Sequence, residues 1–224
     1  MVNRTVWVAR HMNEDWNRIL WTDECTFEFD LRVKQRVIRR RGSRYEPSKI
    51  QWQKRRKTPG RLNIWAGIAH NYKSPLIWIE GNGKNGAFLQ HDYVSQVLEP
   101  HMKRILDDLE TVCGKEPLLM EDGNPAHGLR STKNAVHHWK KLHMIHSLDW
   151  AANSPDMNPI KQIWRIIKQA LRKRRASITT MEQFKAAIEE EYERIPLSKI
   201  NELISTMTER VKAMYLRSGD ATGY

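Results

Sequence analysis

The chain has few cysteines and no long apolar run. Cys25 and Cys113 are the two cysteines in 224 residues, which is too few for a disulfide scaffold or a zinc cluster, so we expect both to be reduced and structural. No apolar run approaches the roughly 20 residues that span a bilayer, and the N-terminal stretch has no apolar signal core. These absences argue against a membrane protein and predict a soluble, intracellular one.

Acidic residues are also scarce relative to basic ones. The sequence holds 38 Lys and Arg against 26 Asp and Glu, which gives a formal net charge of +12 at neutral pH. A surface of this sign suits phosphate backbones or anionic membranes, and the absence of a membrane segment favours a nucleic acid as the partner.

Repeats, long low-complexity segments and a phosphate-binding loop are absent as well. The stretch 81–86 is rich in glycine, but it lacks the Gly and Lys-Ser/Thr spacing that a phosphate-binding loop needs. No linker composition divides the chain. We therefore predict one α/β domain over residues 1–224, with no N-terminal helix-turn-helix module in view.

The patterns that are present alternate between strand and helix. A buried strand is predicted over 19–29, a hairpin over 62–79, a short strand over 117–120 and another that opens at 144–145. Apolar residues at three- and four-residue intervals predict amphipathic helices over 94–109, 131–142, 160–171, 181–195 and 200–214.

Two acidic residues follow predicted strands. Asp23 comes within or just after the first strand, and Asp122 follows the short strand that ends at Met120. Because sites of α/β folds gather where strand ends open into loops, we expect the two carboxylates to be neighbours. His127 lies just past the turn, where its two functional roles would be to contact phosphate or to orient the loop, and an ordinary hydrogen-bonded histidine is the alternative.

The polar stretch 150–164 turns from a loop into a helix and organises the site. Asn158 is a good N-cap, and Pro159 fits the first helical position because it has no N–H to lose there. Lys161 then falls at the third helical position, where the helix dipole disfavours a cation. An acid is expected at this position and a base is present.

Clusters of cations predict contacts to a phosphate backbone. Tyr45 and Trp52 lie between the first two clusters and are suited to stack on unpaired bases. Solvated faces that keep the chain soluble are the alternative, and the last cluster also fits a nuclear localisation signal. The predicted contact residues are Arg39, Arg40, Arg41, Lys54, Arg55, Arg56, Lys57, His127, Arg172, Lys173, Arg174 and Arg175.

Three motifs in order resemble those of Tc/mariner-type DDE transposases, in a form similar to fungal members. They are residues 21–24 (WTDE), 121–127 (EDGNPAH) and 154–164 (SPDMNPIKQIW), and residues 207–219 resemble the usual end of such a catalytic domain. The resemblance implies a ribonuclease H-like mixed sheet flanked by helices, with additional C-terminal helices.

The resemblance also implies a chemistry. Members hold two divalent ions, Mg²⁺ or Mn²⁺, with three carboxylates for phosphoryl transfer on DNA. Asp23 and Asp122 carry over as metal ligands, whereas Lys161 occupies the position of the third acid.

We therefore expect a nuclear, DNA-binding, transposase-derived domain in which cleavage and strand transfer are impaired and metal binding is weakened. One alternative is an active transposase that takes its third ligand from elsewhere, for which Asp156 is the nearest substitute. The other is a domesticated, non-catalytic DNA- or partner-binding protein. A homodimer is left open as the assembly.

Overall fold

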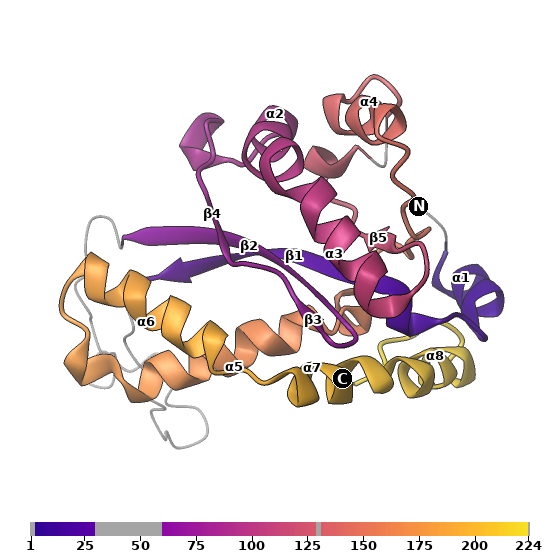
Figure 1. Ribbon diagram of the computed structural model, residues 1–224. Helices are drawn as coiled ribbons and strands as arrows, with labels where there is room; N and C mark the ends of the chain where they lie inside the picture. Colours follow the sequence, from indigo (N-terminus) through magenta and orange to yellow (C-terminus); the bar gives the residue numbers. More distant parts are fainter. Residues whose placement is uncertain (1–2, 30–59, 129–130, 224) are drawn as a thin grey trace, which may run out of the picture.

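A mixed five-stranded sheet forms the centre of the computed structural model, which describes residues 3–29, 60–128 and 131–223. The strand order is β3-β2-β1-β5, and β4 also pairs with β2 (Figure 1). β1 is antiparallel to β2 and parallel to β5. The strands are β1 (Ile19–Glu28), β2 (Arg61–Ala69), β3 (Tyr72–Lys73), β4 (Ile77–Ile79) and β5 (Leu118–Met120).

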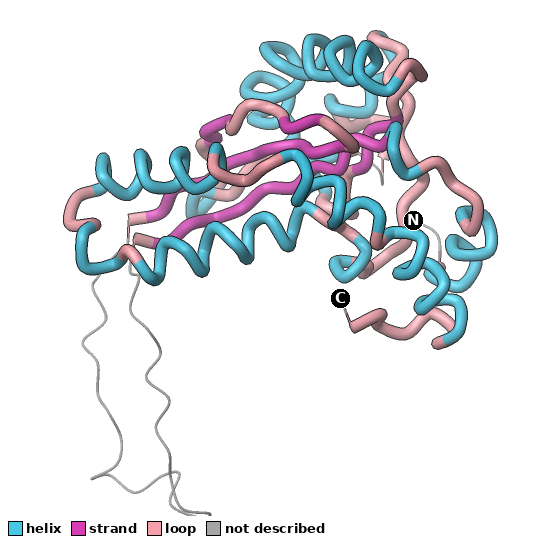
Figure 2. The backbone as a smooth tube through the Cα atoms, turned by 60° about the horizontal axis from the view of Figure 1, so that its bottom comes forward, coloured by secondary structure: helices cyan, strands magenta, loops and turns pink. Residues whose placement is uncertain are grey.

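β1 is buried on both faces because helices cover both sides of the sheet. Ile19 and Trp21 pack into one apolar cluster, whereas Leu20 between them packs into the other. Successive side chains of a strand point to opposite faces, so this division places one core on each side. Figure 2 shows the strands enclosed between helices on both sides.

The two helical layers come from different parts of the chain. The middle of the sequence covers one face, and the two ends together cover the other (Figure 1). The first layer holds α2 (Gln90–Tyr93), η4 (Val94–Met102), α3 (Lys103–Cys113) and α4 (Ala135–Leu142). The second holds α1 (Arg4–His11), α5 (Ile160–Lys173), α6 (Met181–Glu193), α7 (Leu197–Ser205) and α8 (Met207–Leu216). None of the described helices has the length and apolar character to cross a membrane.

The predicted α/β architecture with additional C-terminal helices is confirmed, and the differences have local causes. The helix predicted over 94–109 extends from Gln90 to Cys113, and its turns widen to π-helix around Pro100. Proline has no N–H for the regular ladder and its ring crowds the preceding turn, so a wider turn accommodates it. The helix predicted over 200–214 is broken in two at Thr206.

The prediction that a strand opens at residues 144–145 is wrong. Met144 has a φ of +53°, which ends α4, and the Ile145 N–H donates to the Lys140 carbonyl at 2.9 Å. That bond satisfies a free carbonyl at the helix end, so the backbone of residues 144–145 completes the C-terminal end of α4 and forms no strand of the sheet. Only an isolated bridge between Leu119 and Ser147 joins this segment to β5.

Arg4 joins three segments that are far apart in the sequence. Its guanidinium donates to both carboxylate oxygens of Asp156 at 2.8 Å, to Ser154 Oγ at 2.9 Å and to the Gly219 carbonyl at 2.6 Å. Thr222 also donates to Asp156, through its N–H at 2.8 Å and its hydroxyl at 3.0 Å. Burial opposes ionisation of Asp156, but these donors outweigh it and lower its pKa to about 2.

The depressed pKa of Asp156 predicts acid sensitivity. Because the folded-state pKa lies below the unfolded value, the stabilisation is present above about pH 4 and is lost as the pH falls through about 2. Asp156→Asn is expected to lower the free energy of unfolding by about 2 kcal/mol at pH 7, and by much less near pH 2. Urea unfolding of both proteins across this range measures the difference, and a difference that does not vary with pH contradicts the assignment.

Candidate active site

The two acids of the first two motifs are brought together by the parallel pairing of β1 and β5. Trp21 of β1 lies opposite Met120 of β5 in the register. Asp23 follows Trp21 by two residues, and Asp122 follows Met120 by two residues, so both acids lie equally far beyond the last paired position. The register therefore supports the prediction that the two acids are neighbours, but only Asp122 follows a strand end, because Asp23 lies in the middle of β1, paired with Ala66 of β2.

The third motif is held against β1 by Asn158. Its side-chain amide donates to the Thr22 carbonyl at 3.0 Å, and its Oδ1 accepts the N–H of Ile160 at 3.3 Å. Pro159 has helical dihedral angles (φ −65°, ψ −27°) and is the N-cap of α5, one residue after the predicted N-cap Asn158, and α5 begins at Ile160 as the apolar spacing predicts. These bonds place the first turn of α5, and with it Lys161, directly beside Asp23.

Lys161 and Asp23 form an ion pair. Lys161 Nζ lies 2.8 Å from Asp23 Oδ1, and Trp164 Nε1 donates to Asp23 Oδ2 at 3.0 Å, so both oxygens of the carboxylate are engaged. Asp23 is 7% exposed. Burial raises its pKa, and the attraction of Lys161 offsets only part of this, so the pKa lies at about 6.

Asp122 has a different environment. Its Oδ1 accepts the Asn124 N–H at 2.9 Å and lies 3.1 Å from Nδ1 of His127. His127 Nε2 lies 2.9 Å from Oε1 of Glu24, so the imidazole is held between two carboxylates. Burial opposes the ionisation of His127 and Asp122, but their ion pairing outweighs this effect. The pKa of His127 is therefore raised well above its usual value, and the pKa of Asp122 is lowered.

His127 therefore orients the loop. Its side chain is only 2% exposed and both ring nitrogens have partners, so it does not present itself to a phosphate backbone. Of the two roles predicted for His127, the geometry supports the second. Glu24, its partner on β1, lies next to Asp23 in the sequence and was not singled out from the pattern.

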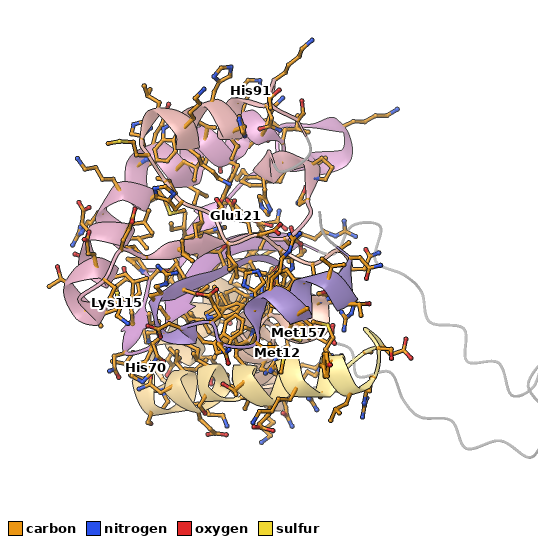
Figure 3. All side chains as sticks on the ribbon, turned by 90° about the vertical axis from the view of Figure 1, so that its right-hand side faces the viewer. Met12, His70, His91, Lys115, Glu121 and Met157 are labelled. Atoms are coloured by element: carbon orange, nitrogen blue, oxygen red, sulfur yellow. The ribbon has the colours of Figure 1, made fainter. Side chains whose placement is uncertain are left out.

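A buried ion pair behind the site was also missed. Lys140 of α4 pairs with Glu121, which Tyr93 Oη contacts at 2.7 Å, and the same ammonium donates to the His127 carbonyl at 3.2 Å. Glu121 is 2% exposed and lies in the interior of the molecule (Figure 3). The available signal was spacing, because Lys140 follows the buried Val136 by four residues and so lies on the inner face of α4.

A cavity of about 240 Å³ opens beside Asp122 and Lys161. The β5 end forms one wall and the stretch 150–158 forms the other. Its lining residues are Met120, Asp122, Gly123, Trp150, Ala151, Asn153, Ser154, Pro155, Asn158 and Lys161.

The residues around this cavity do not fit a divalent cation as they stand. Lys161 places an ammonium on the carboxylate of Asp23, where a metal would need a third oxygen ligand. Across the described ranges, no three His, Cys, Asp or Glu side chains are grouped to hold a metal ion. Asp156 gives no substitute, because Arg4 and Thr222 occupy its carboxylate.

Only some of the predicted nucleic-acid contact residues lie in the part of the chain that the structure describes. Arg172, Lys173 and Arg175 are exposed at the end of α5, whereas Arg174 pairs with Glu190 and Glu191 at 2.6 Å each. The clusters 39–41 and 54–57, with Tyr45 and Trp52, lie outside the described residues.

A family profile described as DDE superfamily endonuclease matches residues 18–185, three quarters of the chain. The chain belongs to this family. It resembles the Tc1 transposase of Caenorhabditis elegans, with 28% identity over 99% of this chain and 77% of that protein. The Tcb1 transposase of Caenorhabditis briggsae is 27% identical over 99% of this chain and 75% of that protein.

Solved structures agree on the fold. The Mos1 mariner paired end complex with Mn matches at a TM-score of 0.73 with 16% identity, over 97% of this chain and 60% of that one. The catalytic domain of Mos1 mariner transposase matches at 0.65 with 15% identity, over 97% and 90%. This DDE domain is thus of the Tc/mariner type with a ribonuclease H-like fold, as the motifs predict.

The buried pair beside Asp122 generates a stability prediction. Lys140→Met leaves the Glu121 carboxylate buried without its cation and is expected to cost about 3–5 kcal/mol of unfolding free energy. Adding Glu121→Gln removes the stranded charge while keeping an acceptor for Tyr93, so the double variant is expected to recover more than half of that loss. Urea unfolding of Lys140→Met, Glu121→Gln and the double variant tests this, and strictly additive losses argue against the pair.

Proposed function

We propose that this chain is a transposase-derived domain that binds DNA, and that its metal-dependent cleavage and strand transfer are impaired. The single observation that carries the second part is the 2.8 Å contact between Lys161 Nζ and Asp23 Oδ1. The family membership carries the first part, together with the net charge of +12.

The impairment follows from charge and geometry. Exchanging a carboxylate for an ammonium changes the local charge by two units. A unit pair about 4 Å apart is worth roughly 4 kcal/mol at an effective dielectric near 20. Lys161 therefore competes with a cation for Asp23, and it removes one of the oxygen ligands that a pair of divalent ions would need.

Two alternatives make different predictions. An active transposase needs a third oxygen ligand, and Asp156 would have to leave Arg4 and Thr222 to supply it. A domesticated binding protein needs no ligand at all. Metal-dependent nicking separates the active enzyme from the other two, and a cellular phenotype in the absence of nicking would favour the domesticated protein.

DNA binding is supported by the exposed cations at the end of α5. Arg172 and Lys173 at the end of α5 are exposed, as is Arg175 in the turn that follows the helix. One similar Mos1 structure is described as a paired-end complex with the left transposon end, and another as a paired end complex with Mn. We also propose that the protein is located in the nucleus and that residues 172–175 are its nuclear localisation signal.

Binding is expected to depend steeply on salt and weakly on sequence. A protein that neutralises about six phosphates loses roughly three orders of magnitude in affinity between 50 and 200 mM salt, because each contact releases condensed counterions. Fluorescence anisotropy with two unrelated duplexes over this range measures both properties. Absent binding at low salt, or affinity that is indifferent to salt, contradicts the proposal.

Lys161→Glu is expected to raise the affinity for Mg²⁺ or Mn²⁺ and to increase metal-dependent nicking. The substitution returns an acid to the first turn of α5, removes the ammonium from Asp23 and offers a third oxygen ligand. Calorimetric metal titration and a plasmid nicking assay measure the two effects.

Arg165→Glu is the matched control for this experiment. It makes the same change of charge one turn further along α5, but its side chain is exposed and contacts Gln162 instead of Asp23. If Lys161→Glu and Arg165→Glu alter metal affinity and nicking equally, the effect is one of general charge and the assignment of Lys161 to the third ligand position is abandoned.

A further inference from the structure

The turn that follows α5 presents a serine that one alanine separates from four consecutive cations. η7 (Arg175–Ser177) forms this turn, and Ser177 is exposed. Its hydroxyl donates to the Arg174 carbonyl at 2.8 Å, a local bond within the turn. The sequence from Arg172 to Ile178 reads RKRRASI.

We propose that Ser177 is a phosphorylation site for an arginine-directed serine kinase, and that its phosphorylation weakens DNA binding. The second half rests on the proposed function, whereas the modification itself does not. In the reaction, Ser177 Oγ attacks the γ-phosphorus of ATP, the bond from that phosphorus to the bridging oxygen breaks, the hydroxyl proton passes to the kinase base, and ADP leaves.

The recognition chemistry lies in the residues before the serine. Arginine-directed kinases bind guanidinium groups two and three residues before the acceptor in acidic subsites, by paired hydrogen bonds to carboxylates. Arg175 and Arg174 occupy these positions. Arg175 is exposed, and Arg174 would exchange its bonds to Glu190 and Glu191 for those of the kinase.

Among neighbouring hydroxyls, Ser177 is the best placed. Thr180 is the N-cap of α6, where its Oγ1 accepts the Gln183 N–H at 3.2 Å. Thr179 donates to the Gln183 side chain at 2.9 Å. Modifying either would disturb the start of α6, whereas Ser177 forms only a bond within its own turn. That turn holds two backbone bonds, so local opening into a kinase cleft costs little.

The consequence is a change of charge at the proposed DNA contact. A phosphoserine carries a charge of about −1.5 to −2 at neutral pH. It would lie at the C-terminal end of α5, beside Arg172, Lys173 and Arg175, and would neutralise about two of these cations. Each lost phosphate contact is expected to reduce DNA affinity by roughly tenfold at 0.1 M salt and to lower the salt slope by about 0.9.

The test uses the full chain, ATP and the catalytic subunit of a cyclic-AMP-dependent kinase as the probe. Mass spectrometry locates and quantifies the phosphate, and anisotropy titrations from 50 to 200 mM salt compare modified and unmodified protein. Ser177→Ala should bind DNA as the unmodified chain does and should take up no phosphate in residues 172–180.

Ser177→Asp and Ser205→Asp form a matched pair. Both serines are exposed near the C-terminal end of a helix, and Ser205 likewise donates to a carbonyl of its own turn, that of Glu202. Ser177→Asp should weaken DNA binding several-fold, whereas Ser205→Asp should leave it nearly unchanged.

Four results would overturn the proposal or a part of it. Absence of phosphate at Ser177 in the folded chain removes the modification site. If phosphorylated protein keeps its DNA affinity and salt slope, phosphorylation of Ser177 does not weaken DNA binding. Equal losses of DNA affinity for Ser177→Asp and Ser205→Asp lead to the same conclusion. Unmodified protein that fails to bind DNA refutes the proposed function and the switch together, while mass spectrometry still decides the modification site separately.

Discussion

The ion pair between Lys161 and Asp23 is the interaction on which the proposed function rests. The Asp23 carboxylate is nearly buried, so ionising it without a counter-charge is costly, and its pKa of about 6 records that cost even with Lys161 at 2.8 Å. In a site with a third acid, metal ions would supply the positive charge. Here Lys161 of the chain itself supplies the cation, and under the proposed function this leaves the set of metal ligands incomplete.

The remainder of the site positions the two acids of the first two motifs. The parallel register of β1 and β5 sets Asp23 and Asp122 at matching offsets, and Asn158 ties the first turn of α5 to Thr22. His127 bridges Asp122 and Glu24 behind them. These contacts hold Lys161 and the two acids together in one site.

Most of the fold could be predicted from the sequence because its signals are local or periodic. Apolar spacing located the main helices, and β-favouring residues located β1 and the hairpin. The strand expected at 144–145 failed because backbone bonding at the end of α4, not side-chain pattern, sets the path there. The buried pair of Lys140 and Glu121 could not be predicted, because the sequence does not show which residue a lysine on the inner face of a helix will contact.

The response of the unmodified chain to Mg²⁺ tests the central claim most directly. A ligand that binds only the folded state stabilises it by about 2.7 kcal/mol at a hundred times its dissociation constant, and the stabilisation rises with concentration. Thermal unfolding in increasing Mg²⁺ should give the same midpoints as the control series in NaCl at matched ionic strength. This is expected because the Lys161 ammonium already contacts the Asp23 carboxylate. A midpoint that rises specifically with Mg²⁺, as expected for a tight metal site, would contradict this account.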